Sequence, residues 1–136
     1  MLQPQKPTLD QQLMTARIMW GALTMSMFMY GLVLVIIGRI SRIEELTNIP
    51  DSFQFFALMA NTLGLVVYYI YKNKIASEKN FQNRFPFYII CWALNEAIVL
   101  LGFATVFITG DGNGLIYAAN LLVGVTANVL CFPRKD

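Results

Sequence analysis

Long runs of apolar residues alternate along this chain with short polar stretches. Four runs are free of charge apart from a single glutamate, and they cover residues 18–37, 53–71, 87–108 and 115–132. As α-helices, runs of 18 to 22 residues extend over about 27 to 33 Å, and the hydrocarbon core of a bilayer is about 30 Å thick. The pattern therefore predicts four transmembrane helices.

The polar stretches between the runs are too short to form a separate soluble domain. Residues 110–114 read Gly-Asp-Gly-Asn-Gly, which is typical of a tight turn, so the last two helices are expected to form a close antiparallel hairpin. In residues 38–52, apolar residues recur at every third position, which indicates a short helix lying on the membrane surface. We expect an all-α fold in which residues 1–136 form one domain of four transmembrane helices, arranged as two antiparallel hairpins.

Composition and charge support a membrane location. Hydrophobic residues make up 57% of the chain and charged residues 13%, whereas soluble domains contain about 25% charged residues. Two basic residues, Arg39 and Arg42, lie on one predicted side of the membrane. The side that holds both termini has eight, namely Lys6, Arg17, Lys72, Lys74, Lys79, Arg84, Arg134 and Lys135. By the positive-inside rule, both termini are cytoplasmic and the chain is a multi-pass protein of the cytoplasmic (inner) membrane.

The first apolar run is preceded by signals for a helix start. Thr8 followed by Gln11 is the pattern of a capping box, so the helix is expected to begin before the membrane. Arg17 and Trp20 then fall at the interface, where a long cation and an indole ring are favoured. A run of 20 residues is also longer than the apolar region of a signal peptide, so we expect residues 18–37 to be retained.

Glu96 lies in the middle of the third run, about 13 Å from its start at a helical rise of 1.5 Å per residue. An ionised side chain at this depth costs about 2.5 to 3.5 kcal/mol, so a largely neutral, hydrogen-bonded carboxyl is expected. Ser26 lies at a similar depth in the first run, and Asn95 is adjacent to Glu96 in the sequence. We therefore predict an ion-binding site formed by Glu96, Ser26 and Asn95.

The rest of the chain offers little further chemistry. The absence of histidine excludes a His-ligated haem, and no metal site or cofactor is expected. Cys91 and Cys131 belong to no CxxC motif and are interpreted as packing residues. Apart from Glu96, no side chain at membrane depth could serve as a base, nucleophile or metal ligand, so an enzyme is not expected. Because the net charge is only +2, the lipid bilayer and not a nucleic acid is the expected partner.

Small residues spaced four apart predict where helices approach closely. Each run, or its edge, carries one such pair, namely Ala22 and Ser26, Ala60 and Gly64, Ala93 and Ala97, and Gly114 and Ala118. These pairs are expected either to pack the bundle or to form contacts between the subunits of a homo-oligomer. Polar residues within the runs are candidates to form hydrogen bonds between helices, and these include Thr24, Asn61, Asn120 and Asn128.

Residues 95–103, Asn-Glu-Ala-Ile-Val-Leu-Leu-Gly-Phe, resemble the acid-bearing helix of the rotary ATPase proteolipids, the subunit c family. Residues 27–33 are similar to the same pattern with the acid lost, as happens in duplicated members of that family. The resemblance implies a membrane carboxyl that carries an ion. In that family, however, the acid-bearing helix is the second of its hairpin, whereas here it is the first.

Three functions are consistent with the sequence. The first is a small homo-oligomeric membrane protein that binds or relays a proton or a cation at Glu96. The second is a structural or accessory subunit, in contact with other membrane subunits, whose Glu96 stays neutral and hydrogen-bonded. The third is an exporter similar to the small four-helix multidrug transporters, which also use one membrane glutamate.

Overall fold

The computed structural model describes residues 7–38, 52–109 and 114–135, and every regular element within these ranges is helical. The prediction of an all-α fold is confirmed for this part of the chain. The elements are α1 (Leu9–Ile36), α2 (Ser52–Met59), the 3-10 turn η1 (Ala60–Thr62), α3 (Leu63–Ile70), the π turn η2 (Tyr71–Ile75), α4 (Phe81–Thr109) and α5 (Gly114–Leu130). The segment from α2 to η2 is continuous and forms a single rod.

Three rods are long and apolar enough to cross a membrane, among the residues that the structure describes. These are α1, the rod over Gln54–Ile75, and α4. Helix α5 is apolar but shorter, with 17 residues. The predicted surface helix within residues 38–52 lies outside the described residues, except for the two ends of that segment. Most of the predicted turn at residues 110–114 also lies outside them.

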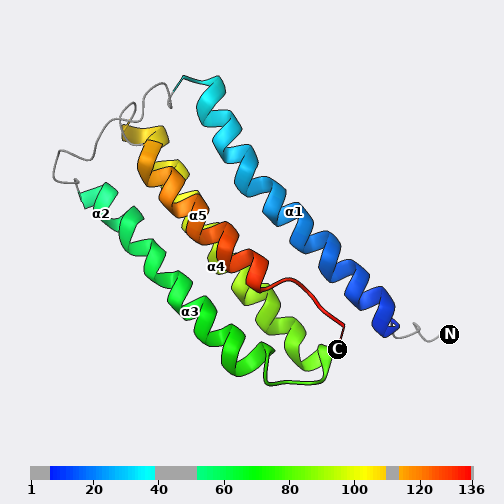
Figure 1. The fold of residues 1–136 in the computed structure, drawn as a ribbon. Helices are drawn as coiled ribbons and strands as arrows, with labels where there is room; N and C mark the ends of the chain where they lie inside the picture. Colours follow the sequence, from blue (N-terminus) through cyan, green and yellow to red (C-terminus); the bar gives the residue numbers. More distant parts are fainter. Residues whose placement is uncertain (1–6, 39–51, 110–113, 136) are drawn as a thin grey trace, which may run out of the picture.

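The helix pair α4–α5 forms the centre of the molecule. The two helices run in opposite directions, with α1 along one side of the pair and the α2–α3 rod along the other (Figure 1). The expected pairing of α4 with α5 is therefore present. The expected pairing of the first two helices is not seen, because α1 and α2–α3 each pack against α4 and α5 and lie on opposite sides of them. Two asparagines of α5 bind the two rods separately: Asn128 donates to Thr24 of α1, and Asn120 accepts from Asn61 of the other rod.

Burial differs strongly between the central and the outer helices. Eleven of the 29 residues of α4 are buried, but only four of the 28 residues of α1 are. The buried residues form two clusters, one around Trp92 near the end that holds both termini and one around Met27 and Tyr117 further along the bundle. Most of the surface of α1 is exposed and apolar, with Met25, Phe28 and Ile36 among its exposed side chains. In a bilayer this surface would contact lipid.

Hydrogen bonds at two helix starts explain why these helices begin before the predicted runs. The predicted capping box is confirmed, because Thr8 Oγ1 accepts the Gln11 N–H at 3.3 Å and Gln11 Oε1 accepts the Thr8 N–H at 2.9 Å. At α4, Asn80 Oδ1 accepts the Gln82 N–H at 3.0 Å. Just before it, the Glu78 carboxylate accepts the Asn80 N–H at 2.9 Å, and this hydrogen bond lowers the pKa of Glu78.

Two glycines allow α4 and α5 to approach closely. A methyl group at Gly102 would lie 2.8 Å from Asn120 Cβ, and one at Gly124 would collide with Val99 Cγ2. Neither glycine belongs to a predicted packing pair. Replacement of either by a larger residue would force the two backbones apart.

The predicted packing pairs differ in their surroundings. Ala60 is buried, and a methyl group at Gly64 would lie 2.9 Å from Val123 Cγ1 of α5. Gly114 is buried at the start of α5. Several others face outward or are only half-buried in this single chain, namely Ala22, Ala93, Ala97 and Ala118. The pair Ala60 and Gly64 therefore lies at a contact within the chain, whereas the outward-facing residues remain open to a second subunit.

Candidate functional site at Glu96

Glu96 lies on the side of α4 that faces α1, and its side chain is half-buried. Its Oε1 atom is 2.9 Å from the hydroxyl of Ser26 and 2.9 Å from the hydroxyl of Tyr30. Ser26 and Tyr30 are four residues apart, so both point from the same face of α1. One carboxyl oxygen is thus held between two hydroxyl groups of one neighbouring helix.

The hydrogen bonds of Ser26 are compatible with either protonation state of Glu96. Ser26 Oγ is also 2.7 Å from the main-chain oxygen of Leu23. A serine hydroxyl has a single hydrogen, so it cannot donate to Leu23 and to Glu96 at the same time. When Ser26 donates to Leu23, its contact with Glu96 is a hydrogen bond only if the carboxyl carries a proton. When the carboxyl is ionised, both hydroxyls can donate to it. Each protonation state therefore has hydrogen-bond partners.

Apolar and aromatic side chains hold the cluster in place. The Tyr30 ring packs against Phe103 of α4, with 5.3 Å between ring centroids. Tyr117 of α5 donates a 2.6 Å hydrogen bond to the main-chain oxygen of Met27, which lies between Ser26 and Tyr30 in the sequence. A methyl group at Gly31 would lie 2.9 Å from the Tyr117 hydroxyl, so a larger residue at this position would require the Tyr117 ring to shift. These contacts fix the register of α1 against α4 and α5.

Asn95 does not join Glu96 in the structure. Its side chain is fully buried and faces α5, where its Nδ2 donates to Asn128 Oδ1 at 3.4 Å. Consecutive residues of an α-helix point about 100° apart, so adjacency in the sequence does not place two side chains at one site. Asn95 was predicted as part of the ion-binding site and instead belongs to a second polar cluster.

That second cluster joins α1, α4 and α5 closer to the end that holds the termini. Asn128 Nδ2 donates to Thr24 Oγ1 at 2.7 Å, and Trp20 Nε1 donates to the main-chain oxygen of Asn128 at 2.8 Å. The Oδ1 atom of Asn95 is buried there with no hydrogen-bond partner among the described residues. The Trp20 ring also meets Phe132 edge to face, with 4.9 Å between centroids. These groups tie α1 to the central helices.

A third polar cluster joins the other outer rod to the central helices. Asn120 Nδ2 donates to the main-chain oxygens of Ala57 at 2.9 Å and of Ile98 at 2.8 Å. Its Oδ1 accepts a hydrogen bond of 2.9 Å from Asn61 Nδ2. The expectation that Thr24, Asn61, Asn120 and Asn128 form hydrogen bonds between helices is therefore confirmed.

The two cysteines take no part in any of these clusters. Cys91 and Cys131 are free thiols that are fully buried in the apolar cluster around Trp92, so their interpretation as packing residues is confirmed. Within the described ranges, no group of three or more Cys, Asp or Glu side chains could hold a metal ion. The Glu96 cluster itself consists of one carboxyl and two hydroxyls.

Tyr30 is the site residue that the sequence analysis missed. A signal for it was present, because Tyr30 lies one helical turn after Ser26 and therefore on the same face. Tyr117 carried no comparable signal, since its contact with α1 depends on how α5 packs.

No family model, no curated protein and no solved structure matches this chain. The resemblance of residues 95–103 to the rotary ATPase proteolipids therefore stays an expectation from the sequence.

Proposed function

We propose that this chain is a small multi-pass membrane protein in which Glu96 binds and releases a proton between α1 and α4. The observation that carries the proposal is the position of Glu96 Oε1 between the hydroxyls of Ser26 and Tyr30, in an otherwise uncharged stretch of α4. An acid at membrane depth is costly and is found mostly at functional sites. Because Ser26 has two alternative hydrogen bonds, the Glu96 carboxyl keeps its hydrogen-bond partners whether it is protonated or ionised.

The number of oxygen atoms around Glu96 favours a proton over a metal cation. Hard cations such as Ca²⁺ and Mg²⁺ require six or more oxygen ligands at about 2.0 to 2.6 Å. The described residues place two hydroxyls at Glu96 Oε1, each at 2.9 Å. A single proton needs no more than this arrangement supplies.

The proposed topology has four membrane crossings. Helix α5 extends over about 26 Å and, together with Cys131 and Phe132, occupies the fourth apolar run. An even number of crossings places both chain termini on the same side. That side carries the larger share of basic residues and is therefore the cytoplasmic one.

We further propose that the chain forms a homo-oligomer. Ala22 lies one turn before Ser26, and Ala93 lies nearly one turn before Glu96, and both are exposed in the single chain. Small exposed residues on a membrane helix favour close contact with another helix. A second copy packed at this position would complete the surroundings of the half-buried carboxyl.

A structural role for Glu96 is the second candidate, and one observation favours it. Helix α1 buries only four residues, and several of its contacts with α4 and α5 are hydrogen bonds, including those to Glu96. In this alternative Glu96 stays protonated and fastens α1 to the bundle in an accessory membrane subunit.

Proton flux into proteoliposomes separates the two candidates. With an imposed pH gradient and a pH-sensitive dye inside, we expect flux through the wild type, and we expect Glu96→Gln to lower it to the level of empty liposomes. Glutamine keeps the shape and hydrogen bonding but cannot ionise. Glu78→Gln is the matched control, because it removes an acid outside the apolar runs, and its flux should equal that of the wild type. Absence of flux in the wild type, with an equally stable Gln variant, would leave the structural role.

A further inference from the structure

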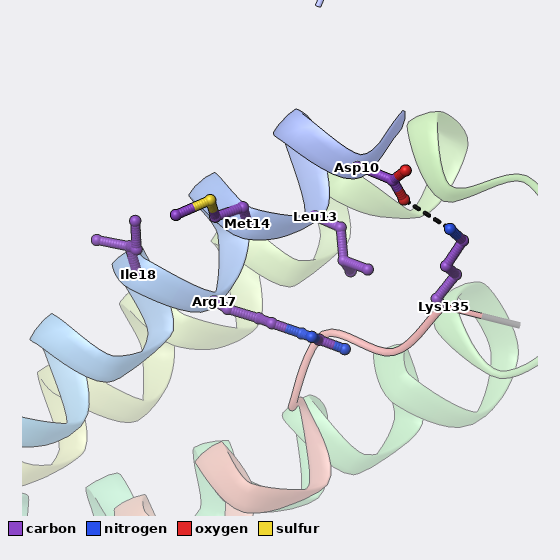
Figure 2. A pocket seen from close by; sticks show the side chains of 6 residues that line it. All are labelled: Asp10, Leu13, Met14, Arg17, Ile18 and Lys135. Carbon is purple, nitrogen blue, oxygen red and sulfur yellow. Dashed lines mark hydrogen bonds and ion pairs between the residues drawn. The ribbon is translucent and has the colours of Figure 1, made fainter. Parts of the chain in front are cut away.

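The C-terminal segment and the start of α1 border an open hollow at the end of the bundle that holds both termini. The hollow has a volume of about 480 Å³. It is lined by Asp10, Leu13, Met14, Arg17, Ile18 and Lys135 (Figure 2). None of these residues takes part in the Glu96 cluster, so the hollow is a separate feature of the molecule.

Two of the lining residues, Arg17 and Lys135, are cations that have further N–H donors available. The Lys135 ammonium forms an ion pair with Asp10 at 2.6 Å, and both side chains are largely exposed, at 54% and 77%. Such an exposed pair is weak, and an ammonium group has two further N–H donors. Arg17 uses its Nε–H for a 3.4 Å hydrogen bond to the main-chain oxygen of Pro133, which leaves the four N–H groups of its terminal nitrogens.

A second hollow that shares residues with the first adds positive charge. It has a volume of about 170 Å³, shares Leu13 and Lys135 with the first, and is lined also by Lys79 and Arg84. Arg84 is buried, with its guanidinium carbon 6.0 Å from the centre of the Phe81 ring. The residues that line the two hollows therefore include four cations and one acid, Asp10.

The apolar side of the first hollow continues onto the outer surface of α1. Met14 and Ile18 are 65% and 61% exposed, and Figure 2 shows both projecting from α1 next to Arg17. Beyond them the exposed surface of α1 is apolar along its length. Basic groups thus lie at the end of the bundle, where lipid headgroups are expected, and apolar side chains lie where acyl chains would begin.

We propose that this hollow binds the headgroup phosphate of an anionic phospholipid. Arg17 and Lys135 donate charge-assisted hydrogen bonds to the phosphate oxygens, while Ile18, which follows Arg17 at the start of the apolar run, contacts the acyl chains. The inference depends on the membrane location of the chain and not on any role of Glu96. Basic pockets between transmembrane helices on the cytoplasmic side are suited to anionic headgroups, and the charge distribution of this chain favours that side.

Lipid binding to the purified full chain in detergent tests the proposal. Native mass spectrometry would count bound phosphatidylglycerol and phosphatidylcholine with identical acyl chains. We expect phosphatidylglycerol to bind more tightly, and we expect Lys135→Gln and Arg17→Gln each to weaken it about fivefold, the effect of one basic residue near a membrane surface. Asp10→Asn should strengthen binding, because it releases Lys135 from its ion pair. Lys72→Gln removes an exposed lysine outside both hollows, so it should have no effect.

Three results would overturn the proposal. The first is equal affinity for the two lipids. The second is a loss in Lys72→Gln as large as that in Lys135→Gln, which would indicate diffuse surface charge. The third is equal stabilisation by inorganic phosphate and by phosphatidylglycerol, measured as the melting temperature, which would indicate a site for free anions. Because Lys135 is exposed, its variant is expected to fold even if Arg17→Gln does not.

Discussion

At the scale of single residues, the two hydroxyls that contact Glu96 are not equivalent. Ser26 has a choice between Glu96 and its own helix, because Leu23 offers it a main-chain oxygen at 2.7 Å. Tyr30 has Glu96 as its hydrogen-bond partner, at 2.9 Å, and its ring is held by Phe103. Ser26 is therefore suited to follow the protonation of the carboxyl, and Tyr30 to hold it in position.

We expect Tyr30→Phe to destabilise the bundle by about 0.6 kcal/mol, and by no more than about 1.7 kcal/mol, the range measured for hydrogen bonds between membrane helices. Phenylalanine keeps the ring and its packing on Phe103. The loss of stability therefore measures the contribution of the Tyr30 hydroxyl alone. Tyr69→Phe is the control, because Tyr69 is 66% exposed. Reversible unfolding in detergent measures both variants, and an equal effect in the two would show that the Tyr30 hydroxyl contributes nothing.

Depth in the membrane could be predicted from the sequence at residue scale, but rotation about the helix axis could not. Counting residues placed Ser26 at the level of Glu96, and the structure brings them together. Adjacency in the sequence grouped Asn95 with Glu96, although the Asn95 side chain faces α5. The side of α4 that contacts each neighbouring helix depends on how the helices pack. A mostly apolar sequence carries little information about the rotation of a helix about its axis.

At the scale of helices, the close contact between α4 and α5 requires glycine. A methyl group at Gly124 would meet Val99 Cγ2 and would lie 3.0 Å from the main-chain oxygen of Asn95, which cannot move aside without bending α4. The predicted packing pairs were small residues four positions apart, and neither Gly102 nor Gly124 belongs to such a pair. The partner of a glycine is on another helix, and spacing along one helix does not reveal it.

We expect Gly124→Ala to destabilise the bundle by about 1 to 3 kcal/mol, the usual cost of overpacking a close contact. Gly21→Ala is the matched control, because no atom lies within 4 Å of the added methyl group. Alanine is also favoured over glycine in a helix by about 1 kcal/mol, so this variant should be neutral or more stable. Unfolding in detergent would compare them, and equal stability of the two variants would contradict the packing described here.

At the scale of the whole molecule, both termini and the turn between η2 and α4 lie at the same end of the bundle (Figure 1). The number and approximate positions of the helical rods followed from the apolar runs alone. Their arrangement did not, because two hairpins side by side and a central pair flanked by two rods have the same apolar pattern. Contacts between helices, which the pattern does not encode, decide between them.

Reporter fusions test the proposed orientation. We expect fusions at residue 80 and after the C-terminus to report the cytoplasm, and a fusion at residue 112 to report the opposite side. The physical reason is the excess of basic residues at the end that holds the termini. A C-terminal fusion that reports the same side as the fusion at residue 112 would show that α5 does not cross the membrane.

The central claim is that Glu96 gains and loses a proton within the membrane, and carbodiimide labelling measures this most directly. Carbodiimides react with protonated carboxyls in apolar surroundings, and mass spectrometry of the labelled protein identifies the modified residue. We expect labelling at Glu96 that decreases as the pH rises and is absent in Glu96→Gln. Labelling that does not change with pH, or no labelling of Glu96 at any pH, would contradict it.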